Sequence, residues 1–313
     1  MGINMLLTTI KKSWTVFIPT FVMILCYSVY IVSGVQLLIL SFVRNKKFNP
    51  IVSWLTSVVL LAVGNVCNAI SIFGYGIIFH FLRALCLVFV FEEFGLRYGV
   101  VFGRYEFTDS LGPRVSERLP ALVLVLWTCL LYPSILLGTA IFTGSPTGTI
   151  PKSRRVLSSS FAAVVVVMFD VVSEPVGVLF GHKIWHHAAF IDADCTTYTG
   201  VADWVYQINQ PLSSYFGIPL HNFIGWYTVS FIVSLDFSLS INSSSIHWNQ
   251  NIISWLPPGV ALFSTMLFYV LHPCHPLGVK AAGIAYIFTL SMSLYHAIAS
   301  NNVGRFRYEF AKR

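Results

Sequence analysis

The chain has 313 residues, of which 56% are hydrophobic and only 10% charged, and its mean hydropathy is +0.75. Average soluble chains carry about a quarter charged residues, so this composition excludes a soluble globular domain. The formal net charge of +7 forms no basic stripe, which excludes a nucleic-acid partner and suits contact with anionic membrane lipids. The apolar residues come in blocks of membrane-spanning length. We therefore expect an all-α, polytopic transmembrane helical bundle.

A single integral-membrane, multi-pass domain of about eight spans is expected over residues 1–313. Lys11 and Lys12 precede an apolar run longer than the core of a signal peptide, which indicates a signal anchor. Pro257 and Pro258 interrupt the seventh span and should kink it or delay its start. A basic tail at 305–313 follows the last span. The expected spans are, in chain order, 14–43, 51–73, 77–95, 120–142, 160–180, 218–238, 252–271 and 277–298.

Two carboxylates stand inside the fifth span, in the run FDVVSEP. Asp170 and Glu174 are four residues apart, so on a helix they share one face, one turn from each other. A carboxylate at mid-membrane costs about 2.5–3.5 kcal/mol on insertion scales, so two on one face indicate a site in the bundle interior. With eight spans, the loops after the third and fifth spans emerge at the same membrane surface. Glu92, Asp170, Glu174 and Asn222 are therefore expected to converge at one depth.

A structural alternative exists for this acid pair. Arg83 or Lys280 could neutralise it and hold helices together. Buried ion pairs of this kind are inefficient stabilisers, whereas ionisable groups within a membrane are by default functional. We therefore favour a functional site.

Two sequence blocks carry a family resemblance. The first is EEFGLRYGVVFGRYEFTDSLGP (92–113), and the second joins FDVVSEP (169–175) to YFGIPLHNFIGW (215–226). On these blocks the chain resembles the integral-membrane carotenoid hydratase family, which includes γ-carotene hydroxylases and hydratases of bacterioruberin synthesis. The resemblance covers about residues 79–226. The matching residues are Glu92, Gly95, Gly99, Phe102, Gly103, Tyr105, Phe107, Thr108, Leu111, Gly112, Pro113, Asp170, Glu174, Pro175, Tyr215, Gly217, Pro219, Asn222, Phe223, Gly225 and Trp226.

The resemblance implies addition of water across a terminal alkene of a linear carotenoid, without a cofactor. The alkene is protonated to a tertiary cation, which water then captures. This chemistry needs a positioned acid in a dry pocket and a polar group that holds the water. Asp170, Glu174 and Glu92 are the implied catalytic residues: one of the first two donates the proton, and Glu92 or the other orients water. We assign substrate binding to Asn222, Tyr105, Tyr215, Trp226, Phe102 and Arg83.

The chain departs from the family pattern at two places. Glu174 stands where a second aspartate is expected, which keeps the acid but extends it by one methylene. An insertion at about 182–203 separates Pro175 from the aromatic pair that the family places soon after it. Trp204-Val205-Tyr206 is the nearest match to that pair. A loop inserted over the site leaves the identity of the isoprenoid substrate open.

Two alternative functions follow from the same residues. An integral-membrane terpene cyclase would begin with the same proton transfer, but neighbouring alkenes would capture the cation while aromatic walls shelter it. A carrier or receptor for lipids would instead predict inverted repeats, and the sequence shows none.

A metal-dependent oxygenase is the remaining alternative. HKIWHH (182–187) and HPCH (272–275) resemble the histidine boxes of membrane di-iron enzymes, in which imidazoles supply most of the ligands. Four of the nine histidines are scattered singly, and the six cysteines form no CxxC pair. We therefore expect no metal site.

Overall fold

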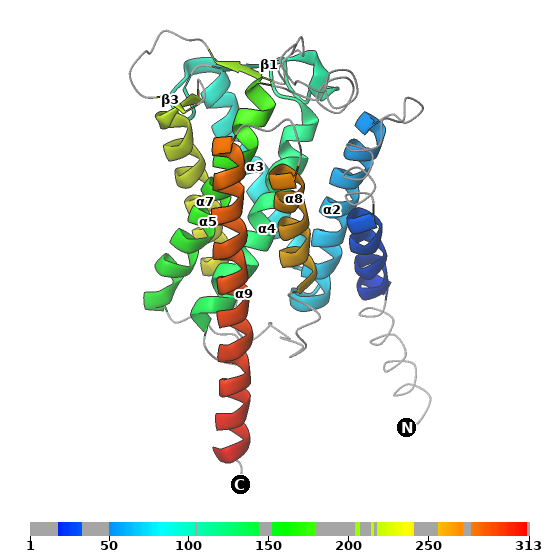
Figure 1. Ribbon diagram of the computed structural model, residues 1–313, viewed down its shortest axis with the longest axis vertical. Helices are drawn as coiled ribbons and strands as arrows, with labels where there is room; N and C mark the ends of the chain where they lie inside the picture. Colours follow the sequence, from blue (N-terminus) through cyan, green and yellow to red (C-terminus); the bar gives the residue numbers. More distant parts are fainter. Residues whose placement is uncertain are drawn as a thin grey trace.

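The computed structural model of the protein is a bundle of helices with short strands over one end (Figure 1). It describes residues 18–32, 50–103, 105–143, 152–179, 204–206, 214–215, 218–240, 256–271 and 277–311. The helices are Ile18–Val32, α2 (Pro50–Phe73), α3 (Ile77–Tyr98), α4 (Ala121–Thr143), α5 (Lys152–Leu179), α7 (Leu220–Ser240), α8 (Leu256–Leu271) and α9 (Leu277–Ala311). The short elements are β1 (Tyr105–Phe107), η1 (Asp109–Leu111), β2 (Trp204–Tyr206), β3 (Ser214–Tyr215) and β4 (Ile218–Pro219).

Five helices in the described part of the chain are long and apolar enough to cross a membrane, namely α2, α4, α5, α7 and α9. The helix Ile18–Val32 and α8 are apolar but shorter. α3 has the length of a span, yet it holds four charged side chains and is not among the five. The expected all-helical architecture is confirmed, whereas the expected count of eight spans is not.

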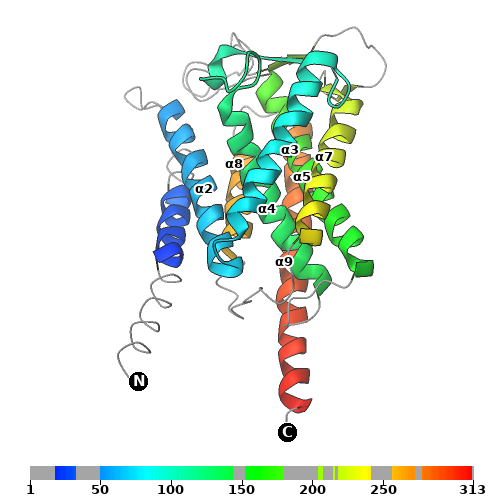
Figure 2. The same ribbon diagram turned by 180° about the vertical axis from the view of Figure 1, so that it is seen from behind.

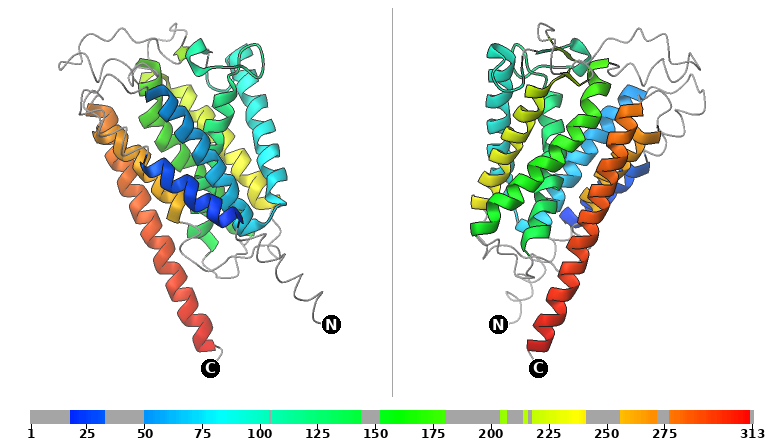
Figure 3. Two further views of the ribbon diagram at one scale, coloured as in Figure 1. Left: turned by 90° about the vertical axis from the view of Figure 1, so that its right-hand side faces the viewer. Right: turned by 60° about the vertical axis from the view of Figure 1, so that its left-hand side comes forward.

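Several helix boundaries differ from those expected. α5 begins at Lys152, eight residues before the predicted start, because the basic residues that we assigned to a linker continue the helix. α9 continues to Ala311 through most of the predicted tail, since no proline interrupts it, and its last turns extend beyond the bundle (Figure 3). α8 carries Pro257 and Pro258 in its first turn, where prolines are tolerated, and the predicted residues 252–255 lie outside the part that the structure describes.

α4 is the central helix of the bundle. Its sequence is apolar around its whole circumference, and most of its side chains are buried, as expected for a helix surrounded by others. α5 packs extensively against both α4 and α7, while α8 and α9 pack against each other and α9 also contacts α5. The two opposite views show α4 among the other helices, with α2 and Ile18–Val32 together at one edge (Figures 1 and 2).

A proline inside α4 is compensated by an asparagine of α2. Pro133 has no N–H to donate to the carbonyl of Cys129, four residues earlier. The side chain of Asn65 donates to that carbonyl oxygen at 3.4 Å and accepts a hydrogen bond from the Tyr27 hydroxyl at 2.6 Å. This buried network ties Ile18–Val32, α2 and α4 together.

The strands cover the end of the bundle at which α3 ends and α7 begins (Figure 1). Gly99 ends α3 in the left-handed conformation, with φ of 68°, and its N–H bonds the carbonyl of Gly95. β1 then pairs with β2 in antiparallel register, Tyr105 opposite Tyr206 and Phe107 opposite Trp204. β3 and β4 form a second antiparallel pair, directly before α7. In the strand layer, β1 of the first sequence block therefore lies beside 204–206, the nearest match to the family's aromatic pair.

Candidate functional site

Three buried carboxyl groups and one buried amide come together beneath the strand layer. Glu92 comes from α3, Asp170 and Glu174 from α5, and Asn222 from α7, and each of the four residues is at most 4% exposed. The Asn222 amide donates to Oδ2 of Asp170 at 3.2 Å. Asp170 also lies within electrostatic range of both Glu174 and Glu92. We call Glu92, Asp170 and Glu174 the carboxyl cluster.

Asp170 and Glu174 interact directly within the carboxyl cluster. They lie one turn apart on α5, and their carboxyl groups share a hydrogen bond as well as an electrostatic interaction. A hydrogen bond between two carboxyl groups requires a proton on one of them. Pro175 follows at once and cannot donate an N–H to the carbonyl of Val171, which lies between the two acids. This turn of α5 therefore brings two acids together away from bulk water.

Glu92 is held by two donors from different elements. Oε2 accepts a hydrogen bond from the hydroxyl of Tyr105 in β1, and Oε1 accepts one from the indole N–H of Trp127 in α4 at 2.6 Å. Two donors fix the plane of the carboxyl group. Each carboxylate oxygen still has a further acceptor position, because it carries two lone pairs.

Burial and the nearby charge of Glu92 raise the pKa of Tyr105 well above its ordinary value. The tyrosine is buried in β1, where its phenolate form would lose hydration and face a carboxylate. Its hydroxyl group therefore stays protonated and remains a donor to Glu92.

An aromatic wall borders the carboxyl cluster. The indoles of Trp127 and Trp226 are stacked, with centroids 3.9 Å apart and planes at 16°. The ring of Phe102 lies 6.3 Å from each of them and 6.1 Å from Tyr105. The cluster thus stands in apolar surroundings. Trp127 was not among the predicted site residues, although an indole N–H inside an apolar helix signals a buried acceptor.

Two glycines make room for Phe102. A Cβ atom at Gly95 would lie 2.8 Å from the Phe102 ring, and one at Gly225 would lie 2.7 Å from the ring and 2.3 Å from the carbonyl oxygen of Val101. Gly95 belongs to the first sequence block and Gly225 to the second. The ring of Phe102 therefore fits between α3 and α7 only because both helices lack a side chain there.

The structure brings most of the predicted site residues together, but Arg83 lies elsewhere. Tyr215 is half-buried in β3, with its ring 6.1 Å from that of Phe223. Arg83 lies nine residues before Glu92 on α3, about 13 Å along the helix axis. It pairs with Asp236 of α7 at 2.7 Å, a residue that we did not predict.

The histidine boxes fall outside the residues that the structure describes, and so does the insertion at 182–203. Within the described part, no group of three or more His, Cys, Asp or Glu side chains is arranged to hold a metal ion. The di-iron alternative therefore receives no support from these residues.

Comparison with known proteins identifies one family. The carotenoid biosynthesis protein family matches residues 48–292 of the chain, well beyond the block at 79–226 that carried the resemblance. Comparisons with curated proteins and with solved structures give no match.

Proposed function

The chain belongs to the carotenoid biosynthesis protein family, and we propose that it is a multi-pass membrane enzyme that hydrates a terminal C=C of a linear carotenoid or related isoprenoid. The observation that carries the proposal is the carboxyl cluster, buried among aromatic side chains at the end of the bundle. Protonation of an alkene needs a strong, positioned acid away from bulk water. No cofactor is required for this reaction.

We assign the acid to the Asp170–Glu174 pair. The proton that the pair shares passes to the less substituted alkene carbon, whose π electrons form the new C–H bond and leave a tertiary cation. Asn222 donates to Asp170, so it orients that carboxyl group and stabilises the charge that remains after proton transfer. After each turnover the pair must regain one proton.

Glu92 is the group best placed to act on water. Its two oxygens are fixed by Tyr105 and Trp127, and each has a free acceptor position for an O–H group. A water molecule held there would attack the cation with an oxygen lone pair. The proton that it releases would pass to Glu92 and return to the pair. Atoms balance, since the product is substrate plus one water.

The stacked indoles of Trp127 and Trp226 are suited to stabilise the tertiary cation that protonation of the alkene forms. The face of an indole attracts cations, and tryptophan is the strongest of the aromatic residues in this respect. A tertiary cation formed beside this wall would be stabilised without a competing nucleophile. The same observation favours a second candidate, a protonation-initiated terpene cyclase, in which a neighbouring alkene captures the cation.

The test is expression in cells that accumulate lycopene or γ-carotene, followed by mass analysis and structure determination of the pigments. We expect wild-type protein to give a tertiary alcohol, and Asp170→Asn and Glu174→Gln to lose it. Asp109→Asn and Glu106→Gln are matched controls, since both residues are exposed in the strand layer. Unchanged yield in Asp170→Asn at equal expression would remove this residue from the mechanism. An isomer of the substrate would favour the cyclase.

A further inference from the structure

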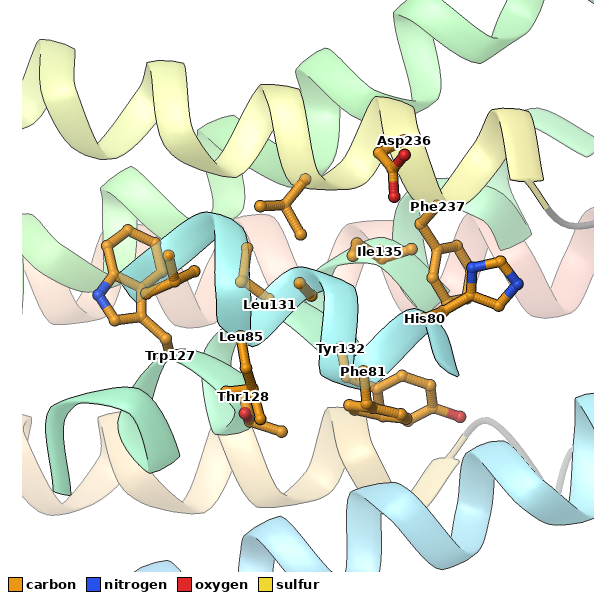
Figure 4. A pocket seen from close by; sticks show the side chains of 13 residues that line it. His80, Phe81, Leu85, Trp127, Thr128, Leu131, Tyr132, Ile135, Asp236 and Phe237 are labelled. Carbon is orange, nitrogen blue, oxygen red and sulfur yellow. The ribbon is translucent and has the colours of Figure 1, made fainter. Parts of the chain in front are cut away.

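A narrow groove lies between α3, α4 and α7, and its lining includes Trp127 but not the carboxyl cluster itself (Figure 4). Its walls are almost entirely apolar: α3 contributes Ala84 and Val88, α4 contributes Leu131 and Ile135, and α7 contributes Val233. Figure 4 shows the lining side chains spread along the helices, with Trp127 at one end and His80, Asp236 and Phe237 at the other. The groove therefore runs parallel to the bundle axis.

One end of the groove meets the site. The ring of Trp127 lines the groove, while its indole N–H donates to Glu92. A molecule lying in the groove against this ring would have its end next to the aromatic wall and the carboxyl cluster. Eight residues separate Trp127 from Ile135, which corresponds to about 12 Å of groove along α4.

The other end is polar and reaches the surface. Asp236 lines it and is 32% exposed in its side chain, and Arg83, which bonds Asp236, is 45% exposed. The Arg83 guanidinium also contacts His80 at 2.9 Å and donates to Ser240. Arg83, which we assigned to substrate binding, thus stands at the end of the groove that is remote from Glu92.

We propose that this groove binds the hydrocarbon chain of a linear isoprenoid, with the reacting end at Trp127 and the chain running toward Asp236. The proposal rests on the proposed function and adds the chain-binding site to it. The apolar walls match a hydrocarbon chain rather than a polar guest. The accessible volume of the groove is about 30 Å³, so its lining side chains must move apart to admit the chain.

The experiment measures binding without requiring turnover. Lycopene is achiral, so it acquires circular dichroism in its visible absorption band only when a chiral site holds it. Purified full-length protein in detergent is titrated with lycopene, for wild type and for the series Ala84→Val, Ala84→Leu and Ala84→Phe. Ala281→Phe on the exposed side of α9 is the matched control. Size-exclusion profiles and melting temperatures establish which variants are folded.

We expect a signal in wild type and in Ala281→Phe, and a loss that grows with side-chain size at position 84. In Ala84→Phe binding should weaken by about tenfold or more, equivalent to about 1.4 kcal/mol of binding free energy. Wild-type binding by folded Ala84→Phe, or no signal in wild type, overturns the proposal. If Ala84→Phe does not fold, Ala84→Leu decides in the same way.

Different results would remove the chain-binding groove and the proposed hydratase activity. Asp170→Asn should bind lycopene like wild type while it forms no alcohol. Lycopene binding that Ala84→Phe abolishes, with no alcohol from wild type, would leave the groove standing and remove the hydratase. Alcohol formation by wild type and by Ala84→Phe alike, with unchanged binding, would leave the hydratase standing and remove the groove.

Discussion

Trp127 of α4 donates its indole N–H to Oε1 of Glu92 on α3 at 2.6 Å. The same indole stacks on Trp226 and forms one end of the groove between α3, α4 and α7. One side chain therefore links the proposed water-holding carboxylate, the aromatic wall and the proposed chain-binding groove.

Replacing Trp127 by Phe should keep most of the aromatic surface but remove the donor to Glu92. The loss of one partner of a buried, charge-assisted hydrogen bond costs about 1–3 kcal/mol, so we expect turnover to fall about tenfold or more. Since Trp127 positions Glu92, kcat should fall more than KM changes. Trp226→Phe retains both hydrogen bonds to Glu92, so its turnover should fall less than that of Trp127→Phe. Equal turnover in Trp127→Phe and wild type would contradict the positioning role.

Replacing Gly225 by Ala should displace Phe102 from between α3 and α7, because the new Cβ would overlap the Val101 carbonyl and the ring. Overpacking of this kind costs about 1–3 kcal/mol of folding stability. We expect a lower melting temperature and reduced product yield. Gly76→Ala is the matched control, since its Cβ would meet nothing within 4 Å and its φ of −56° suits any residue. A wild-type melting temperature in Gly225→Ala would show that the two sequence blocks are not held together in this way.

Replacing Asn65 by Ala should leave the Cys129 carbonyl and the Tyr27 hydroxyl without their partner. Each buried polar group that loses its partner costs about 1–3 kcal/mol, so the melting temperature in detergent should fall. Asn65 lies outside the carboxyl cluster, so turnover per folded molecule should stay near that of wild type. Melting curves and active-fraction measurements on the same sample test both parts, and an unchanged melting temperature would contradict the compensation of Pro133.

The protonated Tyr105 should contribute a pH-dependent part of the stability. Its pKa is raised in the folded protein, whereas in the unfolded chain it titrates near the ordinary value of about 10. Its contribution is therefore fully present below pH about 10 and is lost as the pH rises toward the folded pKa. Melting temperatures measured from neutral to strongly alkaline pH should fall less steeply in Tyr105→Phe than in wild type. Parallel curves would show that this tyrosine does not contribute.

The convergence of Glu92, Asp170 and Asn222 follows from simple rules applied to the sequence. The spacing of the two acids on α5 fixes a shared face, and the order of the apolar segments places the end of α3 and the start of α7 at the same end of the bundle. The nearest match to the family's aromatic pair, 204–206, also pairs with β1 as a strand. Local periodicity and chain order are sufficient for the convergence of the three side chains, whereas the pairing of 204–206 with β1 was not predicted.

The side-chain contacts that join different helices could not be predicted from the sequence in the same way. Nothing in the sequence near Trp127 specifies Glu92, and nothing near Arg83 specifies Asp236, because such pairs depend on helix rotation and crossing. The extension of α9 to Ala311 was missed because its last part is polar, and hydropathy marks the apolar part of a helix rather than the end of its hydrogen bonds. The role of Gly225 likewise depends on a ring from a distant loop.

The most direct test of the central claim is the source of the oxygen in the product. Membranes that contain the protein are incubated with lycopene in water enriched in heavy oxygen, under argon. Hydration predicts a tertiary alcohol that carries the heavy label, formed without molecular oxygen and absent in Asp170→Asn. An alcohol with unlabelled oxygen that forms only in air, or an unlabelled isomer of lycopene, would contradict hydration by the carboxyl cluster.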